Sequence, residues 1–339
     1  LAAYRRVPGF AAASEWGYAR VAAHRALFSR LTRLLWGDQL NPPTFHLGRW
    51  LFLKGLALSY LAAFVSYALQ ARGLVGPRGI MPAGEFLARA ARALGPARWL
   101  DVPTVFWLVG TSGAALTGVA WAGAALSLLL LAGLAPVLVC FLVWALYLSV
   151  YSTGGIFLGY QWDILLLEAG FLAVLAAPWG LRPRLAEERA PSKTALWLLR
   201  WLWFRLIFTS GVVKLTSGDP TWRSLDALRY HFQTQPLPTP LAWYAHHLPA
   251  SLLRASCAGT FVVELLLPFG VLLPRRPRLL CVLGVDALML TIGLTGNYTF
   301  FNLLAVSLGF LLVDDAVLSG LVPALRRALG AAGGRPAEA

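Results

Sequence analysis

Charged residues are scarce in this 339-residue sequence: Asp, Glu, Lys and Arg together make up 13% of it, about half the share of an ordinary soluble domain. Hydrophobic residues make up 58%, and windows of about 20 residues run without a polar face. This pattern excludes a soluble globular domain, whose helices alternate apolar and polar faces. The sequence therefore predicts an all-α, polytopic integral membrane protein whose partner along most of its surface is the lipid bilayer.

Lysine is the scarcest basic residue, with only Lys54, Lys193 and Lys214 against 26 arginines. The net charge is +14, but the basic residues lie mostly between apolar runs, where they act as topology signals. No basic motif is interleaved with stacking aromatic residues, so we expect no nucleic-acid partner. The Arg- and Ala-rich composition favours a bacterial inner membrane.

Cysteine is also rare, and Cys140, Cys257 and Cys281 each lie inside an apolar run. None belongs to a CxxC motif or a Cys/His cluster, and His246 and His247 are adjacent rather than three or four residues apart. The GxSxG, HExxH, P-loop and GxGxxG motifs are absent as well. We therefore expect neither a metal site nor a cofactor.

Three segments organise the chain. Residues 1–49 are Arg-rich, and the apolar spacing over 14–36 predicts an amphipathic helix on the membrane surface. Residues 50–320 form a helical membrane bundle that contains an ordered loop at 216–250, and residues 321–339 form a basic, Ala/Gly-rich tail. Apolar runs predict roughly nine spans, at 50–71, 102–119, 121–134, 136–152, 160–178, 195–215, 256–273, 279–296 and 299–313.

The orientation of the loop 216–250 depends on how many spans precede it. With the N-terminus inside and the nine spans above, the loop falls inside. One fewer span before it would place the loop outside.

Several ionisable residues fall within the predicted spans, where a charge is costly unless it is paired or hydrated. Four acidic residues balance four basic ones, so pairing between helices is the structural interpretation. In particular, we expect Asp163 and Glu168 to pair with Arg200 and Arg205. Lys214, at the end of a span and before the polar loop, is the candidate for a chemical role as a base. The other members of this intramembrane set are Glu264, Asp286 and Lys54.

The loop 216–250 is rich in Pro, aromatic and His residues, which is not the composition of a flexible linker. Its polar and aromatic side chains are the candidates for a partner or ligand surface. They are Asp219, Trp222, Arg223, Tyr230, His231, His246 and His247.

Longer segments resemble the lipase maturation factors. They include YQWD at 160–163, LLLEAGFL at 165–172, SGDPTWR at 217–223, YHFQTQPLP at 230–238 and ELLLP at 264–268. The resemblance implies a membrane protein that assists the folding or assembly of secreted lipases or other exported proteins. In eukaryotes it implies an endoplasmic reticulum location and a lumenal domain after the last spans.

A weaker resemblance gives the alternative function. Residues 211–215 and Trp222 are similar to the membrane domain of vitamin K-dependent gamma-carboxylases. This similarity implies an enzyme in which Lys214 is the base. A transporter would also explain balanced membrane charges, but neither two matching halves nor paired broken helices are visible.

Overall fold

The chain is all-helical in a computed structural model, which describes residues 4, 6, 8–38, 40–185 and 187–321. The predicted fold class is confirmed. Within the described residues, the only β-type pairing is an isolated bridge between Pro238 and Gly296. The predicted tail, apart from Leu321, lies outside the described residues.

Within the described residues, six helices are long and apolar enough to cross a membrane, and a bent pair of helices raises the number to seven. The bent pair is α17 with η4 (Phe301–Leu312) followed by α18 (Asp315–Leu321), at 114° to each other. The six are α4 (His46–Leu74), α8 (Gly113–Ala132), α9 with η2 (Pro136–Phe157), α11 (Lys193–Thr216), α15 with η3 (Ala250–Leu272) and α16 (Arg275–Thr295).

The expected span 102–119 is wrong. Pro103 and Gly110, whose φ is +75°, divide this region into two four-residue helices, α6 (Arg98–Asp101) and α7 (Phe106–Val109). The following span, α8, starts only at Gly113, where the Ser112 side chain accepts a hydrogen bond from the Ala115 backbone N–H. Two spans rather than three therefore occupy residues 102–152.

The 16-residue helix α10 (Gln161–Ala176) carries the chain back from the end of α9 to the start of α11. Near its start, Asp163 accepts a hydrogen bond from Tyr147 of α9, and its last residue, Ala176, accepts one from Arg49 near the start of α4. Before the loop 216–250, the chain therefore runs along the bundle five times, through α4, α8, α9, α10 and α11, where the sequence predicted six spans; α10 is too short to count among the six helices above. The loop therefore lies at the end of the bundle opposite the start of α4.

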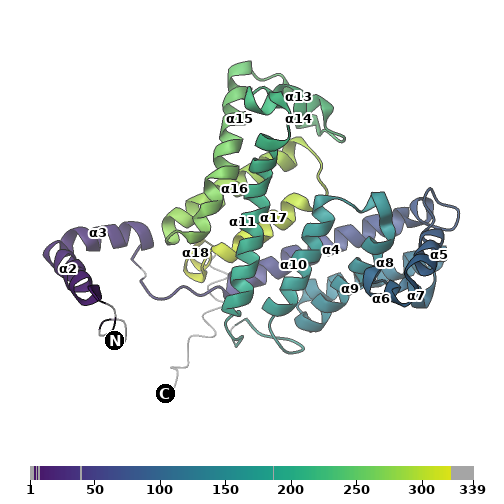
Figure 1. Ribbon diagram of the computed structural model, residues 1–339, viewed down its shortest axis with the longest axis horizontal. Coiled ribbons are helices and arrows are strands. Elements are labelled where there is room, and N and C mark those ends of the chain that lie inside the picture. The colour runs from purple at the N-terminus through teal and green to yellow at the C-terminus, as the bar shows by residue number, and fades with distance from the viewer. Residues whose placement is uncertain (1–3, 5, 7, 39, 186, 322–339) are drawn as a thin grey trace.

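Figure 1 shows two groups of short helices lying apart from each other and away from the described chain ends. One group is α5 (Ala83–Leu94) with α6 and α7, beyond the end of α4. The other belongs to the loop 216–250 and lies beside α15; it contains α12 (Pro220–Arg223), α13 (Ala227–Thr234) and α14 (Pro240–His246).

The core lies around α4, against which α8 packs along its length. The rings of Tyr60, Phe64 and Tyr147 form a buried aromatic group there, with centroid separations of 5.5–6.0 Å. Gly170 of α10 lets this group approach closely, because a Cβ atom at that position would lie 1.9 Å from the Tyr60 hydroxyl. The aromatic group therefore fixes how closely α10 approaches α4.

The N-terminal segment forms two helices instead of the one expected over 14–36. They are α2 (Phe10–Ala23) and α3 (Arg25–Trp36), divided at His24, and neither buries a residue. The first span, α4, begins at His46 without a side-chain cap of its own. Instead, the Asp315 carboxylate accepts hydrogen bonds from the backbone N–H groups of His46 and Leu47, at 3.0 and 2.8 Å. The start of α18 is thereby fixed to the start of α4.

Candidate functional site

An ion pair joins the ends of α11 and α15 beneath the loop 216–250. Lys214 Nζ donates to both carboxylate oxygens of Glu264, at 2.7 and 2.8 Å. The Glu264 side chain is only 3% exposed and that of Lys214 is 24% exposed. Gly211 makes this approach possible, because a Cβ there would lie 3.0 Å from Glu264 Cβ. The ammonium also lies 5.4 Å from the ring centroid of Trp222.

The middle of the loop is fixed to the far end of α16. Gln235 Nε2 donates to the Thr295 carbonyl at 2.7 Å, and the Asn297 N–H donates to the Leu237 carbonyl at 3.2 Å. His231 Nε2 lies 3.4 Å from the Tyr298 hydroxyl oxygen. Burial, and secondly the positive charge of Lys214, lower the pKa of His231. The loop is thus an ordered cap on the bundle.

Two aspartates shape the start of this cap. Asp219 caps α12 by accepting hydrogen bonds from the Thr221 hydroxyl and backbone N–H, at 2.7 and 2.9 Å, and these bonds lower its pKa. Asp226 accepts from Arg254 Nε of α15 at 3.0 Å, and this hydrogen bond is the main cause of its lowered pKa. Arg223 donates weakly to the Leu215 carbonyl at 3.4 Å. Of the predicted loop residues, Asp219 and Arg223 thus make local structural contacts; Asp226, which was not predicted, joins the loop to α15.

The adjacent histidines point to different partners. His246 contacts the side chain of Gln233, while His247 Nδ1 lies 2.7 Å from the Trp243 carbonyl and its ring lies 4.2 Å from the Trp243 ring. Tyr230 is more than half exposed. Across the described residues, no group of three His, Cys, Asp or Glu side chains is arranged to hold a metal ion.

Of the four charges expected to pair between two spans, only Glu168 and Arg205 contact each other. Asp163 is buried and accepts from the Tyr147 hydroxyl at 2.5 Å. Arg200 donates instead to the Leu311 carbonyl, at 2.8 and 3.0 Å, with its guanidinium 4.2 Å from the Phe45 ring centroid. The expected four-residue network does not form. Glu168 and Arg205 make one ion pair, while Asp163 and Arg200 each bond to a different, uncharged partner.

Two further membrane charges have no carboxylate or cationic contact in the described part of the chain. Asp286 Oδ1 is a buried acceptor without a hydrogen bond there, and Lys54 donates to the Leu131 carbonyl at the end of α8. Sequence reasoning missed a buried ion pair between Arg49 and Glu188 at the opposite end from the cap. The signal for it was an arginine directly before the first apolar run.

These features define a class of protein: a polytopic helical membrane protein with paired charges between its spans and an ordered polar cap at one end. Residues 47–320 match the family model described as the lipase maturation factor transmembrane domain. The chain therefore belongs to the lipase maturation factor family, as the sequence resemblance indicated.

Its similarity to curated relatives covers most of this chain. It is 47% identical over 275 residues to lipase maturation factor 2 of Gallus gallus, covering 79% of this chain and 38% of that protein. It is 44% identical over 293 residues to human lipase maturation factor 2, covering 80% and 41%. For human lipase maturation factor 1 the identity is 34% over 294 residues, covering 84% and 51%.

The chain thus spans about two fifths to one half of the length of these relatives. No solved structure matches it.

Proposed function

We propose that this protein assists the folding or assembly of secreted lipases or other exported proteins, and that the cap formed by residues 216–250 contacts the client. The family assignment supports the role, since the relatives are named lipase maturation factors. The observation that supports the contact surface is a set of exposed apolar side chains on an otherwise ordered cap. Trp243, Tyr244 and Leu237 are 61%, 65% and 62% exposed.

The distribution of basic residues supports an exported orientation for this cap. The segments that precede α4, connect α10 to α11 and connect η3 to α16 contain 14 arginines and lysines; they are residues 1–49, 177–193 and 273–278. The loops at the cap face, 72–112 and 216–250, contain seven. By the positive-inside rule, the N-terminal face is cytosolic and the cap lies where exported proteins fold. This is the exterior of a bacterial inner membrane, as the composition favours, or the endoplasmic reticulum lumen in eukaryotic relatives.

The carboxylase-like alternative requires a free amine at Lys214. An ammonium group that donates to both oxygens of a buried carboxylate has no free lone pair with which to accept a proton. The geometry therefore favours a structural role for Lys214, and we do not extend the enzyme hypothesis.

Cysteine accessibility tests the orientation. Single cysteines at Ser217, Ser224 and Thr239, in a background lacking Cys140, Cys257 and Cys281, should react in intact cells with a membrane-impermeant thiol reagent. A cysteine at Ala190, on the opposite face, is the matched control and should react only after the membrane is broken. The reverse pattern would place the cap in the cytosol and remove direct contact with exported clients.

Co-purification with a secreted lipase tests the contact surface. The double substitution Trp243→Ser and Tyr244→Ser should reduce lipase recovery at least about fivefold, because exposed aromatic side chains dominate such interfaces. Trp179→Ser is the matched control, since Trp179 is 84% exposed on the opposite face. Equal lipase recovery with wild type and the double variant would contradict the proposed contact.

A further inference from the structure

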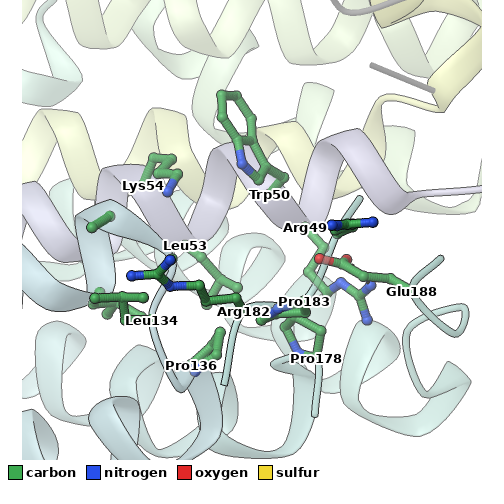
Figure 2. Close-up of a pocket in the computed structure, with 14 residues that line it drawn as sticks. Arg49, Trp50, Leu53, Lys54, Leu134, Pro136, Pro178, Arg182, Pro183 and Glu188 are labelled. Atoms are coloured by element: carbon green, nitrogen blue, oxygen red, sulfur yellow. Dashed lines mark hydrogen bonds and ion pairs between the residues drawn. The ribbon is translucent and has the colours of Figure 1, made fainter. Parts of the chain in front are cut away.

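A cavity of about 590 Å³ lies at the N-terminal face, far from the cap. Figure 2 shows it between the first turns of α4, the turn that joins α8 to α9, and the segment that joins α10 to α11. Four basic side chains line it, from two different parts of the chain: Arg49, Lys54, Arg182 and Arg184. Its volume is within the range of sites that bind small molecules.

The single acidic residue in its lining, Glu188, is already paired. Arg49 Nη2 lies 2.5 Å from Glu188 Oε2, and the two side chains are only 3% and 6% exposed. Arg184 approaches Glu187 at 3.5 Å, but both side chains are at least 70% exposed, and such pairs bind weakly. The one carboxylate in the lining is therefore bonded to Arg49, while four basic side chains line the cavity.

Among the basic residues of the cavity, Lys54 and Arg182 have no described carboxylate within ion-pair distance. Lys54 donates to the Leu131 carbonyl, one of the free carbonyls at the end of α8, and an ammonium has three donors. Arg182 makes no hydrogen bond or ion pair with the described residues. Figure 2 shows the Lys54 side chain beside Trp50 on α4 and the Arg182 guanidinium below it, near Leu53 and Leu134. An ammonium inside a membrane segment is costly when no carboxylate is hydrogen-bonded to it, and an anion bound in this cavity would stabilise it.

The other walls are apolar. Trp50, Leu53, Leu134 and Pro136 contribute to the lining, and the Lys54 ammonium lies 5.4 Å from the Trp50 ring centroid. A cavity with a cationic end, an apolar wall and a position at the ends of several spans suits a phosphate that carries a lipid tail. Free phosphate would use the cations but not the apolar wall.

We infer that this cavity binds the phosphate headgroup of an anionic phospholipid, held chiefly by Lys54 and Arg182. The ion pair of Arg49 with Glu188 forms one fixed side of the site. This site is independent of the proposed client surface, because it lies at the opposite end of the bundle.

Native mass spectrometry of the full chain, released from nanodiscs, tests this inference. We expect phosphatidylglycerol to be retained in preference to phosphatidylcholine, and the double variant Lys54→Gln/Arg182→Gln to retain it roughly tenfold to thirtyfold less. The matched control, Arg223→Gln/Arg229→Gln, removes two exposed arginines from the cap and should leave retention unchanged. Thermal melting checks that both variants are folded.

Inorganic phosphate provides the second arm. If 10 mM phosphate at constant ionic strength displaces phosphatidylglycerol or protects the protein equally well, the ligand is a soluble phosphate and the lipid assignment is wrong. Equal retention of the two lipids, or unchanged retention in the folded Lys54/Arg182 variant, would overturn the site itself. Loss of retention in that variant alone would support it.

Discussion

Lys214 and Glu264 are 50 residues apart in the chain, yet the Lys214 ammonium contacts both oxygens of the Glu264 carboxylate. The pair lies where α11 and α15 meet the cap, and the Trp222 ring covers the ammonium from the cap side. The contact therefore connects two spans to the loop that follows the first of them. It gives the cap a fixed position relative to the bundle.

Removal of one partner of this pair should be more harmful than removal of both. Glu264→Gln or Lys214→Met leaves a charge without its partner, and we expect each to lower the free energy of unfolding by roughly 3 kcal/mol. The double variant Lys214→Met/Glu264→Leu should recover much of that loss. Melting in detergent, analysed as a double-mutant cycle, measures the coupling. Additive losses in the double variant would show that the two side chains do not interact.

Gly170→Ala should destabilise the core by about 1–3 kcal/mol, because the new methyl group would overlap the Tyr60 hydroxyl. Gly118→Ala is the matched control in another membrane helix: no atom lies within 4 Å of a Cβ at that position. The control should be neutral or stabilising by up to about 1 kcal/mol, owing to the better helix propensity of alanine. Thermal melting of the two variants compares them, and an equally stable Gly170→Ala variant would contradict the close packing of α10 on α4.

The cap should weaken in mild acid. Because the folded-state pKa of His231 is lowered, the unfolded cap binds a proton more readily than the folded one. The stability that His231 contributes is therefore present above about pH 6.5 and is lost as the pH falls toward the lowered pKa. We expect the melting temperature to fall between pH 7.5 and 5.5 in the wild type and to fall less in His231→Gln.

The His231→Gln variant serves as the control for the other histidines, because both proteins contain them. Asp226 also has a lowered pKa, held by its hydrogen bond from Arg254, but its contribution is lost only at a pH below the ordinary aspartate value of about 3.9. It does not interfere with the measurement. An identical pH dependence in wild type and His231→Gln would show that His231 is not the group that titrates.

The sequence predicted the helices well where apolar composition alone decides them. It failed at 102–119, because hydropathy does not register that Pro103 and Gly110 interrupt an otherwise apolar run. The partners of the membrane charges were harder to predict. Glu168 pairs with Arg205 as expected, but Arg200 donates to the backbone carbonyl of Leu311 in η4. This contact depends on how α17 and η4 pack against α11.

The ion pair between Lys214 and Glu264 and the cationic cavity were also beyond prediction from the sequence. Glu264 was recognisable as a membrane charge, but its contact with Lys214 depends on how closely α11 and α15 approach at Gly211. The cationic cavity had no sequence signal, because its lining comes from three segments that are distant in the chain. Helices that local composition determines could thus be predicted, whereas contacts that depend on packing between distant segments could not.

The bond between Asp315 and the start of α4 has a consequence for the order of assembly in time. The helix α4 is the first span of this bundle to be synthesised. The carboxylate that accepts hydrogen bonds from its first N–H groups is 268–269 residues further along the chain. During synthesis, the backbone N–H groups of His46 and Leu47 must therefore bond to water or lipid headgroups until Asp315 has been made. A chain that ends before residue 315 would therefore leave these two N–H groups of α4 without the carboxylate that caps them.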